Sequence, residues 1–273
     1  MDLQKLCIHT ITNKPWSLTE ALDAYCAKGI GGISIWQNIV ETLGARETGR
    51  ILHEYPIAVV SYVRGGFFAH TSEDGRQKAV DANKKLLDEA AEIGAPMMVL
   101  VCGSDPHQSL TTSRDQIKEA IEKLIQHATS LGITLTIEPL HPMYADTRSA
   151  VNTLEQANDL AEYFDCPAVG VAVDVYHLWW DPNLEDEIAR CGRGKNLDAF
   201  HICDWKSPTT DMLNDRGLMG EGCIPIEKIS NWISAAGFNG FDEVEIFSNN
   251  YWAMDQHEFL ELIITAYINL HDD

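Results

Sequence analysis

Four side chains suited to metal binding and proton transfer stand at the ends of four successive strand-like segments. They are Glu138, Asp174, His201 and Glu245. Isoleucine and leucine occupy every second position before Glu138, and valine does the same before Asp174. Because successive side chains of a β-strand point to opposite faces, each polar side chain points away from the aliphatic row. We therefore expect the four to meet on the inner side of one sheet or barrel.

Chemistry follows from this convergence. Three carboxylates gathered in a site of low dielectric constant repel one another, and each is driven toward its protonated form. A divalent cation removes that penalty, so the cluster predicts a metal site with Glu138, Asp174, His201 and Glu245 as ligands. Oxygen-rich ligation with one imidazole favours Mn²⁺, with Mg²⁺ or Co²⁺ as alternatives, over a structural zinc. The competing interpretation is four ordinary polar residues held in ion pairs.

The elements that must position these residues are eight strand-like runs that alternate with amphipathic helical patterns. We expect the strands at residues 6–11, 31–36, 57–63, 97–103, 133–140, 169–175, 197–205 and 242–248. Eight such units predict an α/β fold, a (β/α)8 TIM barrel, formed as one domain over residues 1–273. The competing doubly wound sheet usually has a glycine-rich phosphate loop after its first strand, and residues 8–13 contain no glycine.

Loop lengths predict which end of the barrel carries the active site. The helix-to-strand turns are short, whereas the strand-to-helix loops at 64–74, 104–113, 177–183, 206–222 and 249–255 are long. Active sites of TIM barrels are built from the strand-to-helix loops. Loop 206–222 is too long for a plain connector and is expected to be a lid or a binding loop. Trp36 and Trp205, near strand ends, are expected to stack on a sugar or a flat aglycone, or to form a rim or an oligomer contact.

Composition excludes several classes of partner. The chain of 273 residues has 20 Lys and Arg against 41 Asp and Glu, a formal net charge of −21. This charge repels nucleic acid and anionic membrane surfaces. No apolar run approaches the roughly 20 residues that span a bilayer. The seven cysteines form no CxxC pair, and the N-terminus lacks a signal-peptide pattern, so we expect reduced thiols and a cytoplasmic location.

Four motifs resemble those of the xylose-isomerase-like superfamily of sugar isomerases and epimerases. They are Thr136-Ile137-Glu138-Pro139-Leu140, Asp174-Val175-Tyr176-His177, His201-Ile202-Cys203-Asp204-Trp205 and Asp242-Glu243-Val244-Glu245-Ile246. The resemblance covers nearly the whole chain and implies a TIM barrel with one catalytic divalent metal. It implies isomerisation, epimerisation or dehydration of keto sugars and polyols. In the epimerases of this family two glutamates move the proton, which gives those roles to Glu138 and Glu245.

A narrower resemblance concerns His141, just beyond the first proposed ligand. The segment 138–144 is similar to that in large subunits of bacterial C-glycoside deglycosidases, which act on 3-oxo-C-glucosides. There a histidine near the metal abstracts the proton α to the ketone and the aglycone leaves by β-elimination. By this analogy His141 is the base, since an imidazole pKa of about 6.5 suits that task; the alternative is a hydrogen bond within the loop. The resemblance also implies a small partner subunit.

Further residues are expected to bind substrate. His177 is assigned to a substrate hydroxyl or to support of the metal ligands. Arg216 and Glu221 match the family's substrate-side loop, and Arg216 is expected to bind sugar oxygens. His9 is expected to be structural.

The function predicted from the sequence is therefore proton abstraction α to the carbonyl of a keto sugar by a metal-dependent enzyme. C-glycoside cleavage, a lyase outcome, is the specific prediction. A ketose or sugar-phosphate isomerase or 3-epimerase is the alternative, and a metal-free sugar-binding barrel is the non-enzymatic one. The expected ligand is a small keto sugar or a 3-oxo-glycoside, bound by a hetero-oligomer or a homo-oligomer.

Overall fold

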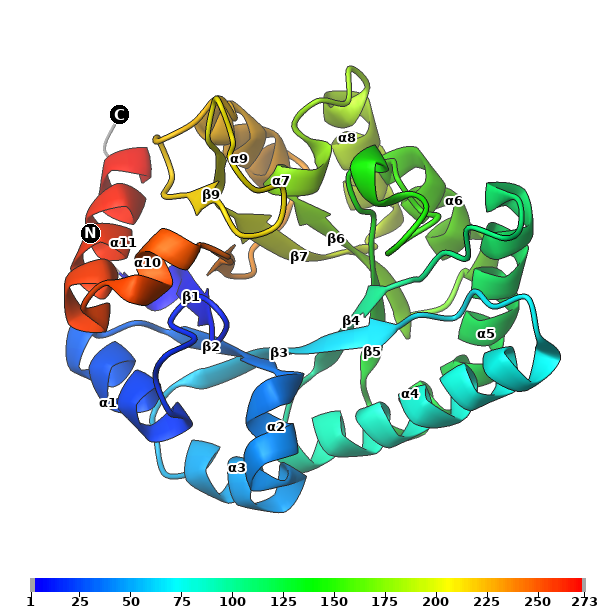
Figure 1. Ribbon diagram of the computed structural model, residues 1–273, viewed down its shortest axis with the longest axis horizontal. Helices are drawn as coiled ribbons and strands as arrows, with labels where there is room; N and C mark the ends of the chain where they lie inside the picture. Colours follow the sequence, from blue (N-terminus) through cyan, green and yellow to red (C-terminus); the bar gives the residue numbers. More distant parts are fainter. Residues whose placement is uncertain (1–2, 272–273) are drawn as a thin grey trace.

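A closed barrel of parallel strands forms the centre of the protein (Figure 1). The computed structural model describes residues 3–271, and within this range eight strands close in the order β1-β10-β7-β6-β5-β4-β3-β2. The barrel strands are β1 (Leu6–His9), β2 (Gly32–Trp36), β3 (Ala58–Gly66), β4 (Met97–Val101), β5 (Thr134–Glu138), β6 (Val169–Asp174), β7 (Leu197–Ile202) and β10 (Asp242–Val244). The predicted (β/α)8 TIM barrel is confirmed.

Helices surround the barrel and cover the outer side of its strands (Figure 1). The α-helices are α1 (Leu18–Lys28), α2 (Gln37–Leu43), α3 (Ala45–Leu52), α4 (Glu73–Ile93), α5 (Leu110–Leu131), α6 (Leu154–Phe164), α7 (Val175–Leu178), α8 (Leu184–Gly194), α9 (Ile226–Ala235), α10 (Asn249–Ala253) and α11 (Gln256–His271). Two short 3-10 helices are η1 (Leu3–Lys5) and η2 (Pro142–Tyr144). None of the described helices is both long and apolar enough to cross a bilayer.

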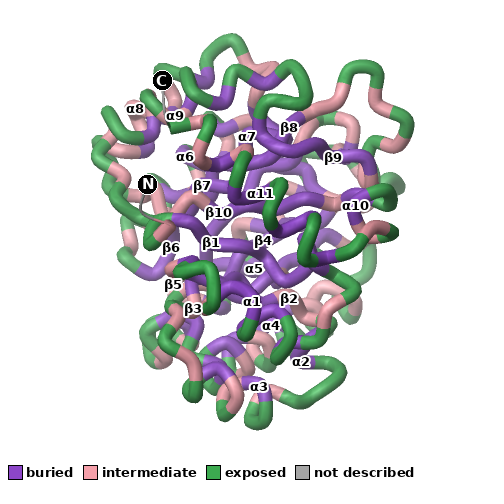
Figure 2. The backbone as a smooth tube through the Cα atoms, turned by 90° about the vertical axis from the view of Figure 1, so that its left-hand side faces the viewer, coloured by how far each residue is buried: buried purple, intermediate pink, exposed green. Residues whose placement is uncertain are grey.

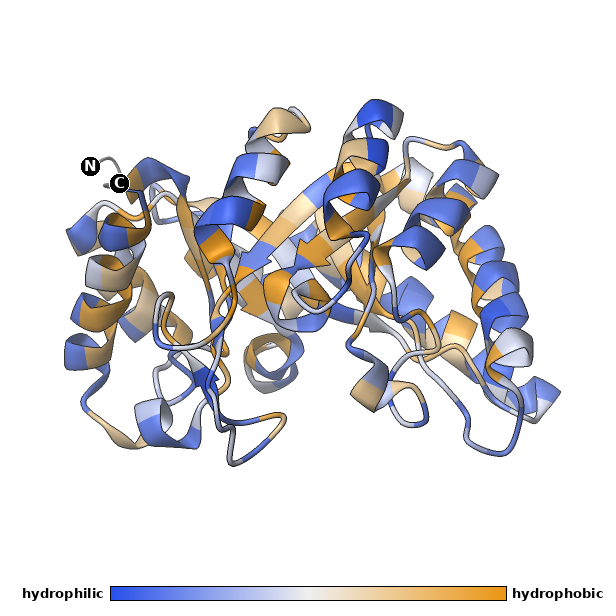
Figure 3. Ribbon diagram, turned by 90° about the horizontal axis from the view of Figure 1, so that it is seen from above, coloured by the Kyte–Doolittle hydropathy of each residue, from blue (hydrophilic) through white to orange (hydrophobic). Residues whose placement is uncertain are grey.

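The hydrophobic core lies between the strands and the helices, as strand alternation predicts. Ile137, Val173 and Ile202 are fully buried and belong to the main apolar cluster. Each precedes or follows one of the polar positions, so the polar side chains point to the barrel interior. Buried backbone concentrates in the strands, and exposed residues lie on the outer helices and loops (Figure 2). Hydrophobic residues gather on the strands in the same way (Figure 3).

The seventh predicted strand is shorter than expected. We predicted one strand over residues 197–205, but β7 ends at Ile202, and a separate strand β8 (Asp204–Trp205) follows outside the barrel. It pairs antiparallel with β9 (Arg216–Gly217). The reason is Asp204, whose carboxylate accepts hydrogen bonds from backbone N–H groups of Gly220, Gly222 and Ile224. These bonds draw the chain into a folded loop rather than a longer barrel strand.

Candidate active site

Four polar side chains from four neighbouring strands meet at the carboxyl end of the barrel. Glu138 ends β5, Asp174 ends β6, His201 lies in β7, and Glu245 directly follows β10. Asp174 is paired with His201 in register, although the β6–β7 ladder has an irregularity before them. Each side chain is buried, and one ligand-type atom from each lies within 4.8 Å of the others. The structure therefore brings together all four residues that the sequence proposes as ligands.

The charges in this cluster interact strongly. His201 Nδ1 lies 2.9 Å from Glu138 Oε1. Burial alone lowers the pKa of His201, but the carboxylates of Glu243 and Glu138 outweigh it and raise that pKa to about 10. Burial, opposed by Arg216 and aided by the charges of Glu138 and Glu245, raises the pKa of Asp174 to about 6. The cluster thus attracts positive charge, which a proton on His201 supplies in part.

Arg216 reaches the cluster from the loop after β7. Its Nη1 lies 2.9 Å from Glu245 Oε2 and 3.3 Å from Asp174 Oδ2. Burial raises the pKa of Glu245, but the charges of His9 and Arg216 hold it below its ordinary value. The guanidinium carbon also stands 4.3 Å from the ring centroid of Tyr176. Arg216 is therefore fixed in place by charge and by an aromatic face together.

The donor set fits a divalent cation. The buried guanidinium of Arg216 offsets one of the three carboxylate charges of the proposed ligands, and a dication would balance the other two. The 2.9 Å between His201 Nδ1 and Glu138 Oε1 also matches two neighbouring ligand atoms of an ion with bonds of about 2.1 Å. Neutral imidazole is then the ligand, because the ion replaces the proton on His201. Glu138, Asp174, His201 and Glu245 are the residues that could hold it.

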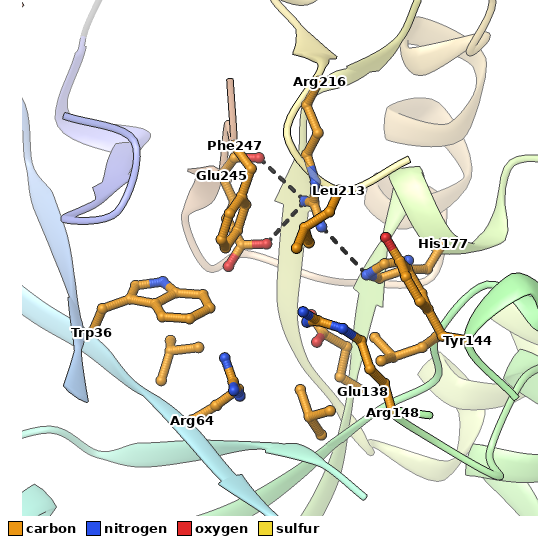
Figure 4. A pocket seen from close by; sticks show the side chains of 13 residues that line it. Trp36, Arg64, Glu138, Tyr144, Arg148, His177, Leu213, Arg216, Glu245 and Phe247 are labelled. Atoms are coloured by element: carbon orange, nitrogen blue, oxygen red, sulfur yellow. Dashed lines mark hydrogen bonds and ion pairs between the residues drawn. The ribbon is translucent and has the colours of Figure 1, made fainter. Parts of the chain in front are cut away.

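A pocket opens above the cluster at the end where the strand-to-helix loops gather (Figure 4). It is lined by Trp36, Val63, Arg64, Val101, Glu138, Leu140, Tyr144, Arg148, His177, Leu213, Arg216, Glu245 and Phe247. Burial and then the charge of Arg216 lower the pKa of His177 well below its ordinary value. Its imidazole is therefore neutral and can donate to or accept from a hydroxyl group. The pocket thus combines polar atoms with the aromatic side chains of Trp36, Tyr144 and Phe247.

Three residues predicted to act on substrate lie outside this lining. His141 packs between Trp180 and Trp205, and its Nδ1 accepts a hydrogen bond from the backbone N–H of Met143. Trp205 also stacks on Tyr176, with ring centroids 4.7 Å apart. The proposed roles of His141 in catalysis and of Trp205 in substrate binding therefore stay predictions. Trp36, His177 and Arg216, in contrast, do line the pocket.

Glu221 is the third of these residues. It is exposed, and its carboxylate accepts hydrogen bonds from the Tyr251 hydroxyl group and from the backbone N–H of Leu218. These bonds tie its loop to α10, so the contacts of Glu221 support the loop rather than a substrate. Substrate binding by Glu221 stays a prediction from the resemblance.

Sequence reasoning missed a buried network beneath the cluster. His9 Nε2 lies 3.0 Å from Glu243 Oε2, and His9 Nδ1 lies 3.0 Å from Glu245 Oε1. Ser34 also donates a hydrogen bond to Glu243, at 2.7 Å. The alternation in the last strand places Glu243 on the same inner row as Glu245, and this pattern could have predicted that Glu243 joins the buried network. The predicted closed barrel makes the first and last strands neighbours, but the register that sets His9 beside both glutamates is known only from the structure.

The loop 206–222 is closely packed at two points. The hydroxyl groups of Tyr144 and Tyr176 both donate to the carbonyl oxygen of Met212, at 2.7 and 2.8 Å. At the other end, a Cβ on Gly222 would lie 2.1 Å from the carbonyl oxygen of Trp205, so only glycine fits there. The loop is therefore a built part of the site and carries Arg216 into it.

Comparison with known proteins now identifies the family. A family model described as Xylose isomerase-like TIM barrel matches residues 27–263. The chain belongs to this family. It is 25 % identical over 224 residues to an inosose isomerase of Bacillus velezensis, which covers 78 % of this chain and 74 % of that protein. It is 26 % identical over 246 residues to a 3-dehydroshikimate dehydratase of Pseudomonas putida, which covers 87 % of this chain but 37 % of that protein.

Solved structures support the same fold. The crystal structure of protein SMc04130 from Sinorhizobium meliloti 1021 matches with a TM-score of 0.95 and 43 % identity, over 98 % of both chains. A crystal structure of the IolI protein with a bound zinc atom matches with a TM-score of 0.80 and 19 % identity, over 97 % of both chains. The second likeness concerns the fold alone. The two relatives named above, an inosose isomerase and a 3-dehydroshikimate dehydratase, are enzymes.

Proposed function

We propose that this protein is a divalent-metal-dependent isomerase or epimerase that moves a proton α to the carbonyl of a keto sugar or keto polyol. The convergence of Glu138, Asp174, His201 and Glu245 under one pocket carries this proposal. Relatives named inosose isomerase support it, because an inosose is a polyol with one ketone. A divalent ion held by these four residues would polarise the ketone and stabilise the charge that develops on its oxygen. Mn²⁺ is the proposed ion, and the zinc-bound IolI structure supports a divalent one.

In this proposal two glutamates transfer the proton. Glu138 and Glu245 both line the pocket and come from strands that β6 and β7 separate in the barrel. One glutamate, as the carboxylate, can take the proton from the α-carbon on one face, and the other, when it is protonated, can deliver its proton to the opposite face. Epimerisation results when the proton returns to the same carbon, and isomerisation when it returns to the former carbonyl carbon.

The other pocket residues orient the substrate. The neutral imidazole of His177 can hydrogen-bond a hydroxyl group, and Arg216 can donate to a hydroxyl or carbonyl oxygen. Trp36 offers an apolar face to the carbon skeleton. With these contacts the reacting carbon would be held within reach of a carboxylate, which is the main requirement for efficient proton transfer.

Elimination is the second candidate outcome. The dehydratase relative supports it, because loss of water also begins with removal of an α-proton. Cleavage of a C-glycoside is the special case predicted from the segment around His141. None of these relatives is named for that reaction, and the isomerase names favour the alternative prediction over it.

The test is exchange with solvent deuterium. Manganese-loaded protein should incorporate deuterium at an α-carbon of one member of a panel of inososes, ketohexoses, keto-sugar acids, keto-sugar phosphates and a 3-oxo-C-glucoside, followed by NMR. Glu245→Gln should abolish that exchange and weaken metal binding, measured as metal content after dialysis. Glu185→Gln, on the exposed side of α8, is the matched control and should leave both unchanged. A fully active Glu245→Gln protein would refute the assignment.

A further inference from the structure

Two arginines of the pocket take no part in the cluster described above. Arg64 lies on β3 and Arg148 on the loop after η2, and both line the pocket. In Figure 4 they enter the pocket from separate elements. Both side chains are only partly exposed. They are therefore cations placed where a substrate must pass or bind.

Neither guanidinium has an anionic partner among residues 3–271. The ion pairs of the described chain include neither Arg64 nor Arg148, although acidic residues outnumber basic ones twofold. Each is instead held by aromatic rings. The guanidinium carbon of Arg64 lies 5.6 Å from the Trp36 ring centroid and 4.9 Å from that of Phe67. That of Arg148 lies 5.3 Å from the Tyr144 ring centroid.

Aromatic support leaves the hydrogen-bond donors of both groups available. A ring holds a guanidinium by its face, so the N–H bonds in its plane still point outward to a ligand. The Nε atom of Arg64 is buried and has no hydrogen-bond partner. A buried donor without a partner is destabilising, and a ligand that accepts its hydrogen bond would remove that cost.

The guanidinium groups of Arg64 and Arg148 also repel each other. Burial, and next the charge of Arg148, lower the pKa of Arg64, and the charges of Glu245, Glu138 and Glu41 offset only part of this effect. Nearer the barrel axis, three carboxylates would be balanced by Arg216 and a divalent ion. Arg64 and Arg148 then line the pocket with no carboxylate of the described residues at ion-pair distance. A neutral hydroxyl group would accept hydrogen bonds there but would not offset this charge, whereas an anion does both.

We infer that Arg64 and Arg148 bind an anionic substituent of the substrate, a carboxylate or a phosphate, while the ketone lies toward Glu138 and Glu245. The position of the ketone in this inference rests on the proposed function, because that function places the reacting carbon at the carboxylates. The substrate class becomes a keto-sugar acid or a keto-sugar phosphate rather than a neutral polyol. The two arginines are the specificity-determining residues of the pocket.

Calorimetric titration of the manganese-loaded protein tests the anion site without turnover. The minimal probes are inorganic phosphate and acetate. Binding of one of them should weaken about tenfold or more in Arg64→Met/Arg148→Met, because a hydrogen bond to a charged group contributes about 1.5–3 kcal/mol. Arg46→Met, at an exposed position of α3, removes the same charge far from the pocket and should bind as the wild type does. The single variant Arg148→Met serves if the double variant does not fold.

A second titration identifies the anion. D-fructuronate, D-fructose 6-phosphate and D-fructose differ at one end of the molecule only. Tighter binding of the first indicates a carboxylate, and tighter binding of the second a phosphate, each by about tenfold over the neutral sugar. Equal affinity for all three, or anion binding that survives removal of both arginines, overturns the inference. Absence of deuterium exchange with intact anion binding contradicts the proposed function but leaves the anion site standing.

Discussion

The Nη1 atom of Arg216 lies 2.9 Å from Oε2 of Glu245, which joins the loop after β7 to the end of the last barrel strand. The same nitrogen lies 3.3 Å from Asp174. Two of the four proposed ligands therefore share one cation that comes from a loop. The charge of the proposed metal site thus depends on how residues 206–222 fold.

Removal of that cation should separate metal binding from catalysis. Arg216→Met leaves three carboxylates with one less positive charge, so Mn²⁺ should bind about tenfold more tightly. Turnover should fall about 100-fold, because a donor to the substrate oxygens is lost. Arg216→Lys keeps the charge and is the control for metal affinity, but a lysine lacks the planar fork of donors and should still lose activity. Isothermal titration with Mn²⁺ and steady-state kinetics measure the two effects. Looser Mn²⁺ binding in Arg216→Met would contradict this account.

Asp204 should control the fold of the loop that carries Arg216. Its carboxylate accepts from the backbone N–H groups of Gly220, Gly222 and Ile224, at 2.8–3.0 Å. In Asp204→Asn the side-chain NH2 group would face some of these backbone N–H groups, and two donors cannot form a hydrogen bond. The loss should destabilise the loop by about 1–3 kcal/mol. We expect faster limited proteolysis within residues 206–215 and a raised KM. Asp186→Asn on α8 is the matched control. A loop equally resistant to protease in both variants would remove Asp204 from this role.

His141 remains the test of the base predicted from the sequence. Burial lowers the pKa of this histidine, so its imidazole is neutral at pH 7 and able to accept a proton. If it is the base, His141→Ala should cut turnover about 100-fold or more with near-normal metal content. Its packing against Trp180 and Trp205 offers the contrasting outcome. Unchanged kinetics with a lower melting temperature would assign it to loop structure alone.

Asp198 should make stability depend on pH. Burial raises its pKa from 3.8 in the unfolded chain to about 6. The protonated form is therefore favoured in the folded state, and this contribution is complete below pH 4 and lost as pH rises through 6. Asp198→Asn cannot ionise, so its free energy of unfolding should exceed that of the wild type by about 3 kcal/mol at pH 7. Urea unfolding from pH 4 to 8 measures this difference. A gain of equal size at pH 4 would show that ionisation is not its cause.

Much of the barrel and of the inner cluster follows from local alternation in the sequence. An aliphatic residue at every second position requires one face of each strand to meet the helices, which sends Glu138, Asp174 and His201 to the other face. Closure of consecutive parallel strands then brings their carboxyl ends to one rim. This reasoning needs only neighbours in the chain and the periodicity of a strand, so it located the candidate ligands without coordinates.

Contacts between distant segments were decided only by the tertiary structure. His9 approaches Glu243 because β1 closes the barrel against β10, and no local pattern encodes that distance. Arg64 and Arg148 come from different loops and strands, so their shared pocket and their lack of carboxylate partners depend on the packing of the whole rim. Strand periodicity is a property of a few residues, whereas the charge of a pocket is a sum over residues that meet only after folding.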